Sequence, residues 1–245
     1  MRILLLGGNG QLGRELRRSL APLGELVVAT RDGVDADAAA NFDDPTALAA
    51  MVRGSGADVV VNAAAYTAVD KAEADADAAF RVNSEAPGAI ARACARIDAL
   101  LVHYSTDYVF DGSASRPYRE DDATAPLGVY GISKLAGEDA IRASGARHAI
   151  LRTAWVYASH GRNFLLTMLR LANERDELRV VADQIGAPTP AAWIADATAD
   201  LIRRGVAESG TWHLVTSGQV SWHGFASAIM EDAHALGLLE RMPTV

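Results

Sequence analysis

The feature that most constrains the fold is a series of short apolar runs separated by longer amphipathic stretches. Each run is about one buried strand long, and the runs are Ile3–Leu6, Leu26–Ala29, Asp58–Asn62, Leu100–His103 and Ala149–Arg152. After the first run, leucines at positions 12, 16, 20 and 23 share one face of a helix. Strands that alternate with such helices form a parallel sheet through crossover connections. The pattern predicts an α/β fold, a Rossmann-type doubly wound parallel sheet with helices on both faces.

After about residue 155 this alternation loosens. The remaining elements that we expect are a helix Asn163–Asn173, a strand Leu178–Val181, a proline-punctuated loop Gly186–Pro190, a helix ending near Arg204, a strand Trp212–Val215 and a helix from Trp222. We therefore predict two parts, a larger domain over residues 1–155 and a smaller C-terminal lobe over residues 156–245.

Charge and cysteine content exclude several classes of protein. The formal net charge of −8 argues against a nucleic-acid partner, which requires a basic surface. One cysteine, Cys94, and six scattered histidines provide neither a disulfide nor a metal cluster. The N-terminal apolar run of four residues is too short for a signal peptide or a membrane span. We expect a cytoplasmic enzyme without a membrane partner.

A glycine-rich segment, GGNGQLG at positions 7–13, directly follows the first apolar run and opens the leucine-striped helix. Glycines there let the backbone turn sharply and approach a pyrophosphate, whose charge meets the N–H groups of the helix N-terminus. The position predicts dinucleotide binding, and the alternative is a tight turn without a ligand. The residues expected to contact the dinucleotide are Gly7, Gly10, Gln11, Leu12 and Gly13.

The end of the second apolar run bears on which dinucleotide is bound. An acidic residue at this place holds the ribose 2′-OH of NAD, whereas an arginine favours the 2′-phosphate of NADP. Arg31 and Asp32 stand there side by side. Arg31 favours NADPH, Asp32 leaves NADH as the alternative, and a surface charge without a role is the third interpretation.

Tyr130 and Lys134 are four residues apart in a stretch predicted to be helical, so their side chains share one face. An ammonium next to a phenol stabilises the phenolate and lowers the pKa of the tyrosine from about 10. The pair then provides an acid/base group that works near neutral pH, as hydride transfer to a ketone requires. An exposed helix pair without a role is the alternative for this pattern taken alone.

A hydroxyl, Thr106, follows the fourth apolar run at the carboxyl edge of the sheet, where open α/β folds bind their ligands. It can hydrogen-bond the carbonyl oxygen that Tyr130 protonates and stabilise the charge that develops there. A turn-capping hydroxyl is the alternative. Small residues at the end of the third run permit close approach of a flat cofactor. These residues are Ala63, Ala64 and Ala65.

Six segments occur in an order that is more specific than any one of them. Besides the glycine-rich segment, they are Asn62–Thr67, Tyr104–Phe110, Tyr130–Lys134, Arg152–Tyr157 and Asp183–Thr189. From Met1 to about Leu239 the chain resembles the dTDP-4-dehydrorhamnose reductases, which are extended short-chain dehydrogenases/reductases. The resemblance implies NADPH-dependent reduction of the 4-keto group of dTDP-4-dehydro-6-deoxy-L-mannose to dTDP-L-rhamnose, with NADH as the alternative cofactor.

The resemblance also implies roles for single residues. Tyr130 is the expected proton donor, Lys134 the ligand of the cofactor ribose, and Thr106 the hydroxyl that polarises the ketone. Asn41 and Phe42 are expected near the adenine, although relatives tend to carry aspartate where Asn41 stands. The residues expected to contact the sugar are Tyr66, Thr106, Asp107, Tyr130, Trp155, Asn163 and Thr189. For Trp155, a core position is the alternative.

Two departures from the family pattern lead to further expectations. Relatives usually continue for several tens of residues beyond the point where this chain ends, at Val245, so we expect the substrate-binding lobe to be truncated. Some relatives hold a metal at a dimer interface through glutamates, and Ala192 stands at one of those positions. We therefore expect no metal, and a homodimer stays open.

Two other functions remain as alternatives. One is a 4-ketoreductase that acts on another dTDP-deoxysugar and differs only in the shape of its pocket. The other is a non-catalytic, cofactor-binding regulatory subunit, similar to the regulatory beta subunit of methionine adenosyltransferase, because a fold does not determine a function. The complete set of Thr106, Tyr130 and Lys134 favours an enzyme.

Overall fold

The computed structural model describes residues 1–245, and its contacts divide the chain into two units. The first contains Met1–Thr153 and Ala195–Leu214, and the second contains Ala154–Ile194 and Val215–Val245. The sequence predicted a single boundary after residue 155 and a continuous second part. The second unit is instead interrupted, because residues 195–214 supply most of a helix and an edge strand to the first unit.

The first unit is built on a seven-stranded sheet in the order β10-β6-β5-β4-β1-β2-β3, and all its strand pairs are parallel. The strands are β1 (Arg2–Leu6), β2 (Glu25–Thr30), β3 (Ala38–Ala39), β4 (Val59–Asn62), β5 (Leu100–Thr106), β6 (His148–Thr153) and β10 (Gly210–His213). The five apolar runs form its five central strands, and they are buried because helices cover both faces. The predicted Rossmann-type α/β fold is confirmed.

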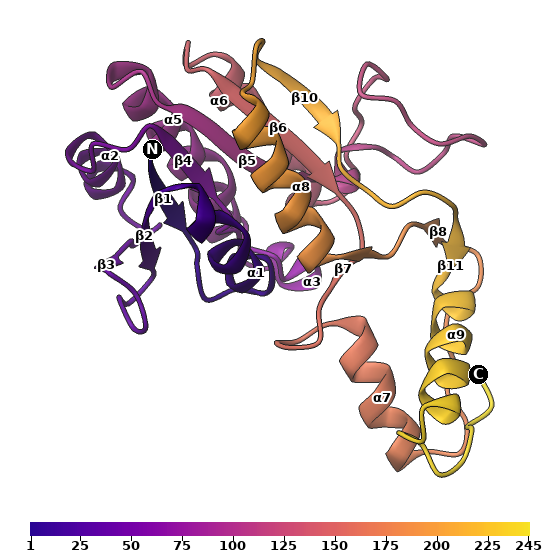
Figure 1. Cartoon of the computed structure of the whole chain (residues 1–245). Helices are drawn as coiled ribbons and strands as arrows, with labels where there is room; N and C mark the ends of the chain where they lie inside the picture. Colours follow the sequence, from indigo (N-terminus) through magenta and orange to yellow (C-terminus); the bar gives the residue numbers. More distant parts are fainter. The chain divides into compact units, whose positions relative to one another are not determined.

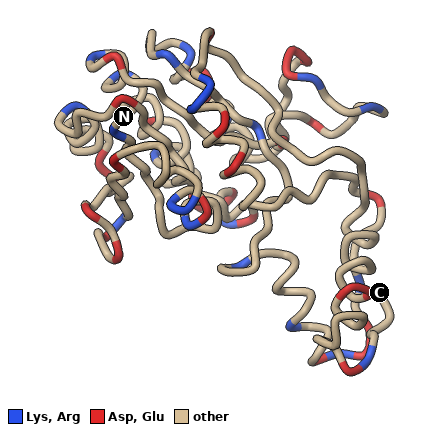
Figure 2. The backbone as a smooth tube through the Cα atoms, viewed as in Figure 1, with Lys and Arg blue, Asp and Glu red and all other residues tan.

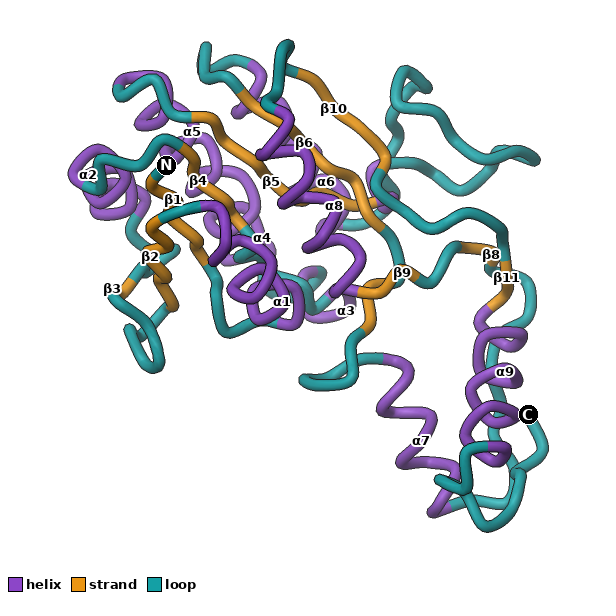
Figure 3. Tube along the Cα trace, in the orientation of Figure 1, coloured by secondary structure: helices purple, strands orange, loops and turns teal.

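Helices lie on both faces of this sheet (Figure 1). One face carries α1 (Gln11–Leu20) and α8 (Ala191–Arg204), which a salt bridge of 2.7 Å joins between Arg18 and Asp196. The remaining helices are α2 (Pro45–Gly54), α3 (Val69–Ala72), α4 (Ala76–Phe80), the π-helical turn η2 (Arg81–Glu85), α5 (Ala86–Arg96) and α6 (Val129–Arg142). Figure 3 shows how helices and strands alternate along this unit.

The first helix ends earlier than its leucine pattern predicts. Its α-helical part stops at Leu20, and Ala21–Leu23 form a 3₁₀ turn, η1. Pro22 explains the change, because proline has no N–H to continue the α-helical hydrogen-bond ladder.

The register of the central strands determines which residues meet at their carboxyl ends. Leu6 of β1 pairs with Asn62 of β4, and Asn62 pairs with His103 of β5. The segments that leave these strands, including the glycine-rich turn after Leu6, therefore start at one edge of the sheet.

The second unit contains helices α7 (Phe164–Glu174) and α9 (Trp222–Ala235) and two small sheets. In one sheet β7 (Val156–Tyr157) runs parallel to β9 (Thr189–Pro190), and in the other β8 (Ile185–Gly186) runs antiparallel to β11 (Val220–Ser221). The core residues between α7 and α9 include Met168, Ala172, Ile229, Met230 and Ala233.

The strand predicted at Leu178–Val181 does not form. Leu178 donates one backbone hydrogen bond to Thr244, and the only β-bridge in this segment joins Glu177 to Thr244. The apolar residues of the segment instead serve the helix core, since Leu178 and Val180 pack against it. The predicted loop at residues 186–190 likewise contains the last residue of β8 and the whole of β9.

Acidic and basic residues are not gathered in long blocks along the chain. Figure 2 shows acidic and basic residues interspersed along the chain, whose formal net charge is −8. None of the helices combines the length and the apolar character that crossing a membrane would require.

Candidate functional site

The glycine-rich turn joins β1 to α1 and lies against the end of β4. Gly7 has a φ of +81°, a conformation that side chains rarely allow. A Cβ atom on Gly7 would lie 2.7 Å from the backbone nitrogen of Ala64, and one on Gly13 would lie 2.1 Å from the carbonyl oxygen of Gly7. Glycine is therefore required at both positions, because two other backbone segments occupy the space of a side chain.

The same turn leaves the start of α1 open. Gly10 precedes the helix and offers no side-chain cap, and a Cβ atom on it would meet only the Gly7 carbonyl oxygen, at 3.5 Å. Gln11 and Leu12, the first two helical residues, are half-buried. An uncapped helix N-terminus at the carboxyl edge of a parallel sheet is the setting in which a pyrophosphate binds.

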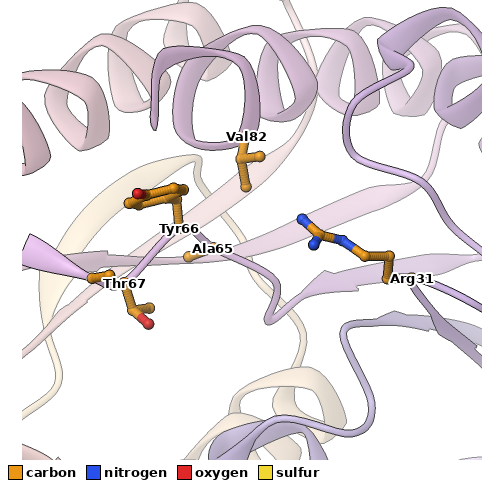
Figure 4. A pocket seen from close by; sticks show the side chains of 6 residues that line it. Arg31, Ala65, Tyr66, Thr67 and Val82 are labelled. Atoms are coloured by element: carbon orange, nitrogen blue, oxygen red, sulfur yellow. The ribbon is translucent and has the colours of Figure 1, made fainter. Parts of the chain in front are cut away.

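Arg31 lies beside this turn and lines an open pocket. The pocket has a volume of about 250 Å³, and its lining residues are Arg31, Ala65, Tyr66, Thr67, Ala68 and Val82. In Figure 4 the Arg31 guanidinium extends toward the side of the pocket that Tyr66 and Val82 border. Tyr66, which the sequence assigned to the sugar, therefore shares this pocket with Arg31.

The Asp32 carboxylate accepts hydrogen bonds within its own turn and so has a structural role. Its Oδ1 accepts a hydrogen bond of 3.1 Å from the Val34 backbone N–H and one of 3.4 Å from the Thr30 hydroxyl. The carboxylate closes the turn after β2, which leaves Arg31 as the charged group in the pocket.

The two residues predicted near the adenine are placed differently from one another. Asn41 is exposed, and its side chain accepts a hydrogen bond of 3.0 Å from the backbone N–H of Asp43. Phe42 is buried in the hydrophobic core of the first unit, 4% exposed, so its ring is not available to a ligand. The place of Phe42 near the adenine stays a prediction, since burial of the apolar ring excludes only a contact through that side chain.

Thr106 and Tyr130 meet at the carboxyl end of β5. Thr106 is the last residue of that strand, and its hydroxyl donates to Asp107 at 3.1 Å and accepts from the Tyr108 backbone N–H at 3.2 Å. Tyr130 is in the first turn of α6, with its ring edge-on to that of Tyr108 at 5.5 Å. This β5–α6 corner brings a hydroxyl, a carboxylate and a phenol together.

The pKa of Tyr130 differs from the expected one. Burial raises it to about 12, and the Asp107 carboxylate adds to the rise, while a hydrogen bond with Thr106 opposes it. The sequence predicted a lowered pKa through the ammonium of Lys134. The loss of hydration instead dominates, because burial disfavours the phenolate.

Lys134 lies one turn after Tyr130 and is 2% exposed. Its Nζ donates a hydrogen bond of 2.7 Å to the Tyr104 carbonyl oxygen and lies 3.3 Å from His103 Nε2. Burial lowers the pKa of Lys134 to about 8, partly offset by the charge of Glu138. The amine is thus fixed beneath the end of β5.

A buried ion pair fixes α6 to the sheet. Glu138 accepts hydrogen bonds from Nε and Nη2 of Arg152 on β6, at 2.9 and 2.8 Å, and both side chains are at most 4% exposed. Burial acts to raise the pKa of Glu138, but the hydrogen bonds from Arg152 and Ser105 and the positive charges of Arg152 and Arg142 together outweigh it, so the pKa lies below its ordinary value. This two-point contact holds the helix that carries Tyr130 and Lys134.

The other residues predicted to contact the sugar belong to the second unit. Trp155 has a φ of +47°, and its ring stacks on Trp222 at a centroid distance of 3.5 Å. Asn163 caps α7 through a hydrogen bond from the Leu166 N–H, and its amide donates to the carbonyl oxygen of Ala158. Thr189 is buried and donates to the Ala187 carbonyl oxygen. All three side chains thus have structural contacts of their own.

Sequence reasoning missed several polar residues that support the site. Asn83 is buried in η2 and bonds both the N–H and the carbonyl oxygen of Tyr66, at 2.9 and 3.0 Å. His103 and Arg152 were treated as parts of apolar runs. A polar residue inside an otherwise apolar strand was the available signal, because such a group must find a buried partner.

Comparison with known proteins assigns the family. The family model described as the RmlD substrate binding domain matches residues 1–244. The chain belongs to this family. It is 51% identical to a dTDP-4-dehydrorhamnose reductase of Burkholderia thailandensis and 48% identical to one of Escherichia coli, covering 96% and 97% of this chain and 80% of each relative.

Solved structures of the RmlD family agree. The dTDP-4-dehydrorhamnose reductase of Bacillus anthracis, in complex with NADP, matches with a TM-score of 0.88 and 35% identity over 95% of this chain and 81% of that one. The reductase from Clostridium acetobutylicum matches with a TM-score of 0.88 and 36% identity over 100% of this chain and 84% of that one.

Proposed function

We propose that this chain reduces the 4-keto group of dTDP-4-dehydrorhamnose and forms dTDP-L-rhamnose, with NADPH as the reductant. The observation that carries the proposal is the β5–α6 corner, which brings the Thr106 hydroxyl, the Asp107 carboxylate and the Tyr130 phenol together. Family membership supplies the substrate class, since relatives that are 51% and 48% identical are named for this reaction.

The residues of the first unit fit a dinucleotide. The absence of side chains at Gly7, Gly10 and Gly13 leaves backbone alone to face a pyrophosphate. Arg31 is suited to the 2′-phosphate that distinguishes NADPH from NADH, and Asp32 is engaged in its own turn. When bound, NADPH supplies the hydride for the carbonyl carbon.

The protein's own groups handle the oxygen of the ketone. Thr106 would turn its hydroxyl from Asp107 to the carbonyl oxygen and stabilise the charge that grows there. Tyr130 would give its phenolic proton to that oxygen, so that the ketone becomes an alcohol and the tyrosine a phenolate. A pKa of about 12 keeps the phenol protonated and ready to donate throughout the neutral range.

The proposal also covers the role of the second unit, the cellular compartment and the oligomeric state. The second unit serves as the substrate-binding lobe, with Trp155, Asn163 and Thr189 contributing to sugar binding as the resemblance implies. The protein works in the cytoplasm, where a single buried thiol, Cys94, stays reduced. A homodimer stays a prediction that light scattering will test.

Replacing the phenolic hydroxyl tests the function. Tyr130→Phe should lower kcat by about 10²- to 10⁴-fold, because proton donation acts in the transition state. The assay follows the absorbance of NADPH with dTDP-4-dehydrorhamnose as substrate, and fluorescence titration should show unchanged NADPH binding. Unchanged turnover in the variant would remove Tyr130 from its role, and no turnover by the unaltered chain would contradict the proposed function.

A further inference from the structure

A continuous line of polar groups runs from the segment after β4 to Lys134. The backbone N–H of Ala64 donates to Asn62 Oδ1 at 3.1 Å, and Asn62 Nδ2 lies 3.1 Å from His103 Nδ1. On the far side of the ring, His103 Nε2 lies 3.3 Å from Lys134 Nζ. Asn62, His103 and Lys134 are at most 2% exposed, so bulk water cannot replace these contacts.

The Ala64 backbone determines the direction of this line. A backbone N–H can only donate, so the Asn62 side chain must present its carbonyl oxygen to Ala64 and its NH₂ group to the ring. His103 Nδ1 therefore accepts. Complete burial lowers the pKa of His103 well below its ordinary value, so the imidazole is neutral and has a single N–H group. That proton is on Nε2, where it faces the lysine.

We propose that Asn62 and His103 set the charge of Lys134 by fixing the ring tautomer. An ammonium has donors only, so an Nε2–H group that points at it makes no hydrogen bond. The same N–H group can donate to the lone pair of a neutral amine, which keeps one of its own hydrogens for the Tyr104 carbonyl oxygen. The folded network thus favours the neutral amine and opposes its protonation. Asn62 and His103 are positioning residues that act through Lys134.

Other charged groups around the lysine act in the opposite direction or are engaged elsewhere. Glu138, on the same helix, favours the ammonium through its charge, but its carboxylate is bound on two points by Arg152 of β6. The Asp107 carboxylate, in η3 (Asp107–Val109) after β5, acts on Tyr130. From η2, the neighbouring side chain Asn83 is neutral and binds Ser133. His103 is thus the titratable group in direct contact with the amine.

In the proposed reductase reaction, on whose assignment this step rests, the charge of Lys134 affects turnover. A neutral Lys134 offers no positive charge to the phenolate that Tyr130 becomes after donating its proton. Protonation of the amine, with loss of the Nε2–H contact, would supply that charge. The tautomer itself follows from Ala64, Asn62 and His103 and stands independently of any substrate.

Nuclear magnetic resonance of the full, cofactor-free chain tests the tautomer directly. The ¹⁵N shifts of a histidine ring distinguish a protonated from a bare nitrogen, and the His103 signals are assigned by their loss in His103→Gln. We expect a bare Nδ1 and a protonated Nε2. A proton on Nδ1 with a bare Nε2 would overturn the proposal.

The chain is well suited to measuring the lysine. It contains two lysines, Lys71 and Lys134, and Lys71 is exposed. In ¹³C-lysine spectra Lys71 is an internal reference, and Lys71→Arg assigns the two signals. We expect Lys134 to titrate below the ordinary range of a lysine side chain, and titration within that ordinary range would contradict the neutral-amine network.

Variants of Asn62 separate the tautomer from simple charge effects. Asn62→Asp should accept from both Ala64 and Nδ1–H, so the ring proton moves to Nδ1 and Nε2 becomes an acceptor for the ammonium. Asn62→Ala adds no charge but releases the tautomer. Both should favour protonation of Lys134 by about tenfold, which is one pKa unit. If the pKa of Lys134 rises in Asn62→Asp but not in Asn62→Ala, the effect is due to charge and the proposal is overturned.

A folding control and the reductase assay separate failure of this inference from failure of the variant to fold and from failure of the proposed function. If Asn62→Ala does not fold, as judged by circular dichroism, the ring spectra of the unaltered chain and of Asn62→Asp still decide. In the reductase assay, Asn62→Asp should move the alkaline limb of the kcat profile to higher pH by about one unit. A confirmed tautomer in a chain without turnover would reject the proposed function and leave this inference standing.

Discussion

Tyr130 and Lys134 lie one helical turn apart, and burial moves their pKa values away from each other. Burial raises that of Tyr130 to about 12 and lowers that of Lys134 to about 8. In both residues the buried environment disfavours the charged form. Both shifts therefore favour two neutral groups over a phenolate–ammonium ion pair.

The titration of Lys134 predicts the pH dependence of reduction. Its folded-state pKa is depressed, so its positive charge is present below about pH 8 and is lost as the pH rises through that value. We expect kcat to fall above about pH 8, because the phenolate of Tyr130 then lacks a compensating charge. Steady-state rates between about pH 6 and about pH 10, a range that brackets the transition, provide the measurement.

An arginine serves as the control for this profile. Lys134→Arg keeps a positive charge at all these pH values, because guanidinium does not deprotonate in proteins. Its activity is expected to be lower but without the limb near pH 8. A limb at the same pH in the variant would assign the titration to another group.

At the scale of elements, the attachment of α6 to β6 predicts a measurable stability effect. Glu138→Leu leaves Arg152 buried with its charge uncompensated, at a cost of about 3 to 5 kcal/mol in the free energy of unfolding. The double variant Glu138→Leu/Arg152→Leu removes both charges and should recover most of that loss. Urea denaturation measures all three, and equal losses for the single and double variants would show that the ion pair is not the cause.

The turn between β1 and α1 predicts an effect on cofactor binding. In Gly13→Ala the new Cβ atom would lie 2.1 Å from the Gly7 carbonyl oxygen, so the turn must shift. We expect NADPH affinity to fall by at least about tenfold, since one misplaced backbone contact to a phosphate costs on the order of 1.4 kcal/mol or more.

Gly54→Ala is the matched control for the turn. Gly54 ends α2, and nothing lies within 4 Å of a Cβ atom placed there. Alanine should leave NADPH affinity unchanged and raise helix stability by up to about 1 kcal/mol. Isothermal titration calorimetry on both variants provides the comparison, and equal affinities would show that the turn tolerates a side chain.

The sequence predicts the features that depend on residues close together along the chain, and it does not predict those that depend on contacts between distant segments. The strands and the helix that holds Tyr130 and Lys134 follow from local periodicity, and the glycine turn follows from local backbone freedom. The partners of Asn62, His103 and Arg152 come from strand register and helix packing, which no local pattern encodes. The lowered pKa expected for Tyr130 failed for the same reason, because burial depends on the whole fold.

At the scale of the molecule, the first unit is completed by residues far along the chain. β10 forms its sheet edge beside β6, and Thr198 of α8 bonds the buried Tyr104 hydroxyl at 2.7 Å. A fragment Met1–Thr153 would expose both β6 and Tyr104. We expect it to be unfolded or aggregated in size-exclusion chromatography and circular dichroism. A monomeric fragment with a cooperative thermal transition would show that Ala195–Leu214 are dispensable.

The return of the chain at Ala195 also bears on the order of events at the ribosome. Synthesis proceeds from the N-terminus, so β6 emerges about sixty residues before its outer neighbour β10. During that interval its edge has no partner, and the nascent chain is open to wrong pairing with other strands. Slow translation through residues 154–209 would lengthen this exposure, whereas a chaperone bound to the nascent polypeptide would shield it.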